Sequence, residues 1–179
     1  MKIDEKYFVP FLIVSAIITA IIIAFVTVNN RSERQANFKE SIQKSDSLKY
    51  SYFPVFQSND SLSIQSFEDK YVVVDFWATW TESFSEAAHQ QLAALLHKYP
   101  DRLEVLAAVV EDKTKRVERY IKEHEYPFSY VNGTQVFNTF NVPGVPTQLV
   151  YAPGGELVAI FTGSAEQSRL DSLQTIITP

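Results

Sequence analysis

Residues 72–88 have the sequence VVVDFWATWTESFSEAA, which indicates a strand followed directly by a helix. Its first half is an apolar strand pattern with one acidic residue, Asp75, and its second half has the apolar spacing of an amphipathic helix. A helix that begins directly after a buried strand presents free backbone N–H groups and the positive end of its dipole at its first turn. Such a turn suits a nucleophile or an anion, yet residues 81–84 are Thr, Glu, Ser and Phe.

Strand and helix patterns alternate on both sides of this stretch. Residues 103–110 have the pattern of a second buried strand, and residues 147–163 that of a hairpin around a Pro-Gly-Gly turn. Further elements are expected as a short strand over 61–67 and as helices over 84–99, 114–126, 135–140 and 167–177. A strand-helix-strand unit followed by a hairpin and a closing helix predicts an α/β fold, with helices on both faces of a mixed sheet.

The N-terminus carries a candidate membrane anchor. From Phe8 to Val28 the chain has no charged residue and only Ser15, Thr19 and Thr27 as polar side chains. This length is about what a helix needs to cross roughly 30 Å of hydrocarbon. A cleaved signal peptide is the alternative, but its apolar core is usually about 7–15 residues and a small-residue cleavage site follows it. The sequence therefore favours an uncleaved single-pass anchor over residues 8–28, within an N-terminal segment 1–28.

Residues 29–52 are mostly polar and contain no glycine and no proline. Phe38, Ile42 and Leu48 recur at helix-like intervals, so part of the segment is compatible with a juxtamembrane helix. A solvated linker is the favoured interpretation, because few apolar side chains are available to bury. The folded domain is accordingly expected over residues 53–179.

Composition excludes several kinds of chemistry. The chain has no cysteine, so it forms no disulfide, no thiolate nucleophile and no cysteine-ligated metal site. Its formal net charge of −5 does not indicate the basic surface that nucleic-acid-binding proteins use. His89, His97 and His124 do not have a metal-ligand spacing. We therefore expect no metal, no cofactor and no nucleic-acid partner.

Two motifs carry a resemblance to a known family. VVDFWATW, followed by a helix and then by VPGVPTQLVYAPGGELVAIFTG, resembles a thioredoxin-fold domain of the membrane-anchored TlpA and ResA type. The resemblance extends over roughly residues 53–177. It implies a C-x-x-C motif whose two sulfurs would fall on Thr81 and Phe84, and an acidic residue where this chain has Ala87. The resemblance thus predicts a thiol-disulfide oxidoreductase scaffold that has lost its thiol chemistry.

The substituted positions have structural interpretations. A threonine hydroxyl at the start of a helix commonly caps it, so we expect Thr81 to be a capping residue rather than a nucleophile. Phe84 shares a helical stripe with Ala88 and Leu92, which predicts a ring that fills the space between helix and sheet. Asp75 matches the buried aspartate of the family, and with no sulfur beside it we expect a core carboxyl held by a hydrogen bond or by a buried water.

The second motif implies a binding groove. In the resembling family the proline of a Gly-Val-Pro-Thr sequence is cis, lies beside the active-site helix and borders a groove for an extended peptide. The implied proline here is Pro146. The groove residues implied for this chain are Trp80, Thr81, Glu82, Val145, Pro146, Thr147 and Gly163.

These observations lead to a functional hypothesis. A groove without sulfur predicts a catalytically silent thioredoxin-like protein that binds or organises protein partners. The resemblance further implies an anchor in a bacterial inner membrane, a cytoplasmic N-terminus and a periplasmic domain. Two alternatives remain: an enzyme, which would use partner thiols or a non-thiol activity of Thr81 and Glu82, and a structural subunit of a membrane complex.

Overall fold

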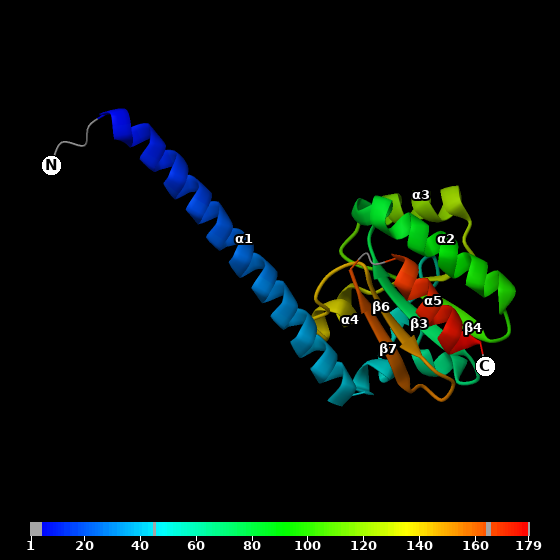
Figure 1. Ribbon diagram of the computed structural model, residues 1–179. Coiled ribbons are helices and arrows are strands. Elements are labelled where there is room, and N and C mark those ends of the chain that lie inside the picture. Colours follow the sequence, from blue (N-terminus) through cyan, green and yellow to red (C-terminus); the bar gives the residue numbers. More distant parts are fainter. Residues whose placement is uncertain (1–4, 45, 164–165, 179) are drawn as a thin grey trace. The chain divides into compact units, whose positions relative to one another are not determined.

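The computed structural model describes residues 5–44, 46–163 and 166–178, without the side chains of residues 5–7, 46, 82–84 and 166–170. Two compact units are present, residues 1–37 and residues 38–179. The elements in chain order are α1 (Glu5–Lys44), η1 (Asp46–Tyr50), β1 (Phe53–Pro54), β2 (Ser61–Leu62), η2 (Ile64–Phe67), β3 (Tyr71–Trp77), η3 (Thr79–Thr81), α2 (Glu82–Lys98), β4 (Leu103–Val109), α3 (Thr114–His124), β5 (Ser129–Asn132), α4 (Thr134–Thr139), β6 (Thr147–Tyr151), β7 (Leu157–Thr162) and α5 (Glu166–Ile177), where η denotes a 3-10 helix (Figure 1).

A five-stranded mixed sheet organises the second unit, in the order β5-β4-β3-β6-β7. β3, β4 and β5 are parallel, while β6 runs antiparallel to β3 and β7 antiparallel to β6. The hairpin between β6 and β7 turns at Gly154 and Gly155, both at positive φ, which glycine adopts without strain. The predicted mixed α/β sheet with its hairpin is confirmed, and the architecture is the thioredoxin fold.

Alternate residues of β3 belong to two separate hydrophobic cores. Val73 and Trp77 belong to one core, together with buried residues of α2, α3 and α5. Val74 and Phe76 belong to the other core, on the opposite face of the sheet, together with α4 and the segment that precedes β1. Every residue from Val72 to Trp77 is buried. This is why the strand is apolar without alternation, as expected for a central strand covered on both faces.

Residues 29–52 were expected to form a solvated linker, but this segment is largely helical and has buried side chains. α1 continues to Lys44, and Phe38, Ile42 and Leu48 are all at most 3% exposed within the second core. These three side chains have the helix-like spacing noted in the sequence, and the apolar surface they bury holds the segment on the domain. The compact domain therefore begins at Phe38 rather than near Phe53.

The prediction of a strand over residues 61–67 is also wrong beyond the first two residues. β2 ends at Leu62, and η2 follows from Ile64 to Phe67. The backbone N–H of Ser63 donates to Ser66 Oγ over 3.1 Å, which stabilises a helical turn at this point. Local side-chain hydrogen bonding thus overrides the apolar alternation.

The first unit consists of the N-terminal part of α1. Within the described residues, one helix is long and apolar enough to cross a membrane, with a mean hydropathy of 2.9 in its most apolar window. Its hydroxyl groups are satisfied inside the helix, since Ser15, Thr19 and Thr27 donate to carbonyls three or four residues earlier. Internal satisfaction of polar groups is what a lipid-facing helix requires.

Candidate functional site

The candidate site lies where β3 ends and α2 begins. Thr81 is the residue before α2, and it is 8% exposed. Its hydroxyl donates to the Ala78 carbonyl over 2.8 Å and lies 3.2 Å from Ser85 Oγ. Because the threonine hydroxyl has one proton, Ser85 is the donor in the second contact. The expectation that this hydroxyl caps α2 is wrong: it bonds backwards to the 3-10 turn and not to the helix N–H groups.

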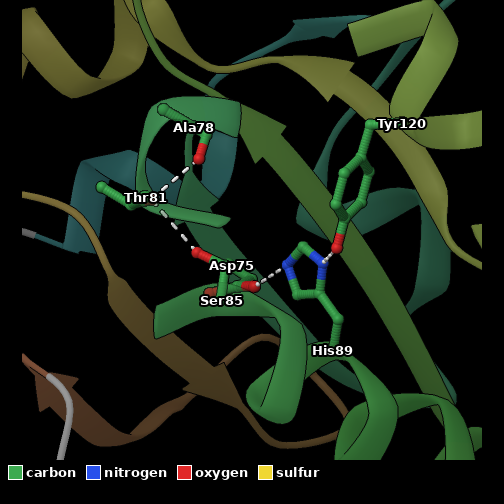
Figure 2. A network of polar contacts seen from close by, with 6 residues as sticks. All are labelled: Asp75, Ala78, Thr81, Ser85, His89 and Tyr120. Carbon is green, nitrogen blue, oxygen red and sulfur yellow. Dashed lines mark hydrogen bonds and ion pairs between the residues drawn. The ribbon is translucent and has the colours of Figure 1, made fainter. Parts of the chain in front are cut away.

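Asp75 belongs to a second buried network (Figure 2). Its Oδ2 atom lies 2.9 Å from Nε2 of His89, and Nδ1 of His89 lies 2.7 Å from the hydroxyl of Tyr120. The aspartate, histidine and tyrosine come from β3, α2 and α3, and each is at most 2% exposed. A neutral imidazole protonated at Nε2 satisfies both contacts, with the carboxylate accepting and the tyrosine hydroxyl donating. The hydrogen bond expected for Asp75 is thus present.

Aromatic rings surround the imidazole of His89. The ring of Trp77 lies 4.8 Å away between centroids, Phe128 lies at 5.5 Å and Tyr126 at 5.9 Å, all in edge-to-face orientation. Edge-to-face contacts of this kind stabilise aromatic clusters beyond their area burial. His89 is therefore a fully packed residue with no exposed surface.

Sequence reasoning missed His89 and Tyr120 as site residues. A usable signal for His89 was present, since Thr81, Ser85 and His89 are four residues apart and so share one helical stripe. This stripe faces the sheet that carries Asp75. Tyr120 had no comparable signal, because its contact depends on how α3 packs beside α2.

Three buried polar side chains lie in one row across the sheet, and each has at least one polar atom without a hydrogen-bond partner among the described residues. Asp75 pairs with Gln148 on β6, and Ala107, its partner on β4, pairs with Tyr130 on β5. Asp75 Oδ1, both amide atoms of Gln148 and the hydroxyl of Tyr130 are buried and lack a hydrogen-bond partner among the described residues. Burial raises the pKa of Tyr130 above its ordinary value, and the nearby Tyr126 and Asp75 raise it further.

Tyr130→Phe should change stability mainly at alkaline pH. The folded state holds the Tyr130 proton more tightly than the unfolded state. The resulting contribution to the free energy of unfolding is fully present below about pH 10 and is lost at higher pH, where Tyr130 ionises in the unfolded chain. At pH 7 the substitution removes an unsatisfied hydroxyl and should leave the unfolding free energy unchanged or about 1 kcal/mol higher. Urea unfolding at pH 7 and about pH 11 measures both effects.

The control for this experiment is Tyr52→Phe, since Tyr52 is 72% exposed. Tyr130→Phe should reduce the loss of stability above pH 10, and Tyr52→Phe should not. Equal alkaline losses in the wild type and Tyr130→Phe would contradict the assignment of Tyr130 as a buried tyrosine that resists ionisation.

The predicted groove residues meet at one end of the sheet. Phe76 pairs with Thr147, so β3 leaves the sheet beside the point where Pro146 leads into β6. The Val145–Pro146 peptide bond is cis, and the N–H of Gly163 donates to the Pro146 carbonyl over 3.0 Å. The turn that carries Trp80 follows β3 at this same end.

Their exposure differs strongly. Trp80 is 61% exposed, and Val145 and Gly163 are partly exposed. Thr147 is buried and donates to the Gly144 carbonyl over 2.7 Å, so its side chain is not available to a partner, and the Thr81 side chain is likewise buried. The side chains of Glu82 and Phe84, including the predicted core position of the Phe84 ring, lie outside the described residues.

The site has no activated nucleophile among the described side chains. The Thr81 hydroxyl proton is donated to a carbonyl, and the nearest histidine, His89, uses both ring nitrogens in contacts with Asp75 and Tyr120. A threonine needs an adjacent free base before it can attack a substrate. Within the described residues no group of three or more His, Cys, Asp or Glu side chains is placed to hold a metal ion.

Comparison with known proteins agrees with the fold. Residues 69–157 match the family model described as thioredoxin-like. The chain is 24% identical to the thiol-disulfide oxidoreductase ResA of Bacillus subtilis (strain 168) over 120 residues, which are 66% of this chain and 67% of the relative. It is 25% identical to ResA of Oceanobacillus iheyensis over 122 residues, 66% of this chain and 63% of the relative.

Solved structures show the same fold. A secreted disulfide oxidoreductase of Mycobacterium tuberculosis superposes with a TM-score of 0.62 and 16% identity, over 74% of this chain and 98% of that one. A putative thioredoxin from Neisseria meningitidis superposes with a TM-score of 0.62 and 18% identity, over 71% and 86%. The chain therefore carries a thioredoxin-like domain, similar in sequence to thiol-disulfide oxidoreductases but built without a single cysteine.

Proposed function

We propose that this protein is a catalytically silent, membrane-anchored thioredoxin-like protein that binds a protein partner in an extended conformation. The observation that carries the proposal is the 61% exposed ring of Trp80 at the former active-site turn of a scaffold without cysteine. A large exposed aromatic at a defined turn is typical of an interface anchor. The implied groove residues at the same end of the sheet are Val145 and Gly163, which are partly exposed, and Pro146, which is buried.

The proposed location follows from the anchor and from the relatives. The apolar part of α1 spans a bacterial inner membrane, the N-terminus is cytoplasmic and the thioredoxin-like domain is periplasmic. The support for this location is the single apolar helix at the N-terminus together with the similarity to ResA proteins. Labelling of the full chain with an impermeant reagent at an introduced cysteine in the domain tests the orientation.

Photo-crosslinking in intact cells tests partner binding. A photoreactive phenylalanine derivative at position 80 keeps an aromatic ring at the anchor, and the same derivative at position 52 replaces another exposed aromatic outside the groove. The proposal predicts a discrete light-dependent protein adduct from position 80 that is absent from position 52. Identical adduct patterns, or none from position 80, would favour a structural subunit in which the anchor matters more than the groove.

Restoring the two sulfurs should restore disulfide formation. In Thr81→Cys/Phe84→Cys the cysteines are three residues apart at the start of α2, within the Cα separation of about 4.4–6.8 Å that a disulfide needs. We expect a near-complete intramolecular disulfide under mild oxidation, detected by mass spectrometry after alkylation. Disulfide-reductase activity should remain low, because Ala87 and the rest of the pocket are unchanged.

The control pairs Thr81→Cys with Gln90→Cys, nine residues along the chain and about 13 Å away at 1.5 Å per residue. This pair should stay reduced under the same conditions. If both pairs oxidise alike, or if neither does, positions 81 and 84 do not correspond to a C-x-x-C motif.

A further inference from the structure

The turn that carries Trp80 is held by a residue from a distant part of the chain. The backbone N–H of Thr79 donates to Oδ2 of Asp112 over 2.6 Å, across a sequence separation of 33 residues. Hydrogen bonds to a carboxylate are shorter and stronger than those between neutral groups. The other carboxylate oxygen, Oδ1, accepts the N–H of Lys113 over 2.7 Å, which fixes the orientation of the Asp112 side chain.

The backbone before Asp112 is shaped to present it. Glu111 has a φ of 47°, in the left-handed region that side chains other than glycine seldom adopt. Its N–H donates to Oγ1 of Thr134 over 3.0 Å, and this threonine is the first residue of α4. The preceding N–H, from Val110, donates to the Trp77 carbonyl over 2.9 Å. The ends of β3 and β4 and the start of α4 are thereby joined around the turn.

Trp80 itself has little packing to fix it. Most of its ring is exposed, so its position depends on the backbone of residues 79–81 rather than on a surrounding core. That backbone is held on one side by Asp112 and on the other by the bonds of the Thr81 N–H and hydroxyl to the Ala78 carbonyl. A binding residue held in place before its partner arrives loses less conformational freedom on binding.

We propose that Asp112 is a positioning residue for Trp80, and that the left-handed turn at Glu111 directs its carboxylate to Thr79. This inference rests on the proposed function, in which Trp80 contacts the partner. Asp112 itself makes no contact with the partner. It acts by ordering the turn over residues 79–81, which carries Trp80.

NMR of the full chain in detergent micelles tests this role without any partner. In Asp112→Ala the exchange protection of the Thr79 amide should fall at least about tenfold, the factor expected for loss of one hydrogen bond to a carboxylate. The {1H}–15N NOE of the Trp80 backbone and indole should fall with it, with the indole resonance identified by Trp80→Phe. Asp112→Asn keeps one acceptor oxygen and should restore part of both signals.

Asp101→Ala is the matched control, because it removes an exposed carboxylate from a different turn. It should leave Thr79 and Trp80 unchanged. The proposal is overturned if Asp112→Ala leaves Trp80 as ordered as in the wild type, whether or not Thr79 loses protection, or if Asp101→Ala has an equal effect. Since no partner is present, this result is independent of whether Trp80 proves to bind one.

Discussion

His89→Ala should lower the free energy of unfolding by about 3–5 kcal/mol, the largest effect we expect from a single substitution in the domain. The substitution leaves the Asp75 carboxylate, which is 1% exposed, without its histidine partner. It also removes the contact of His89 with the Tyr120 hydroxyl and opens a cavity among the surrounding rings. Guanidinium chloride unfolding of the full chain in detergent, followed by tryptophan fluorescence, measures the change.

Two further variants isolate the cause. His97→Ala removes an exposed histidine from the same helix and should change stability by less than about 0.5 kcal/mol. Asp75→Asn in the His89→Ala background removes the unpaired charge, so the double variant should be less destabilised than the sum of its single changes. Additive effects, or a His89→Ala effect as small as that of His97→Ala, would show that the buried pair is not what holds α2 to the sheet.

Trp80→Ala should weaken partner binding by about 2 kcal/mol or more, roughly a 30-fold loss of affinity, with little change in melting temperature. The combination is expected because the ring is mostly exposed in the free protein and would be covered only in the complex. Isothermal titration with the partner captured from position 80, together with thermal unfolding of the free chain, measures both quantities.

Tyr52→Ala is the control for this substitution, since it also truncates an exposed aromatic. It should leave affinity unchanged. Unfolding of Trp80→Ala would instead identify Trp80 as a core residue, and unchanged affinity together with unchanged stability would identify the groove as vestigial.

Much of the fold was predictable because its strands are buried on both faces or joined by a distinctive turn. The uninterrupted apolar run of β3, the similar run of β4 and the glycine pair of the last hairpin each have a local physical cause. The end of α1 was not predictable in this way. Its polar composition indicated a solvated linker, and burial of Phe38 and Ile42 is decided by tertiary packing.

The candidate site was predictable only in outline. The correspondence of Thr81 and Phe84 with a C-x-x-C motif and the cis bond before Pro146 were both implied by the resemblance, and the structure contains that cis bond. The contacts of Asp75 with His89 and of Asp112 with Thr79 join residues 14 and 33 positions apart. Contacts between such distant positions depend on how the helices dock on the sheet, which local pattern does not specify.

In the proposed function the groove binds a protein without thiol chemistry. The most direct measurement is the affinity of the captured partner for the full chain before and after all partner thiols are blocked with iodoacetamide, with the fold of the blocked partner verified by circular dichroism. We expect the same dissociation constant within about twofold, because this chain has no cysteine that could form a disulfide with a partner thiol. Loss of binding on thiol blocking would contradict it and would favour an enzyme that acts through partner thiols.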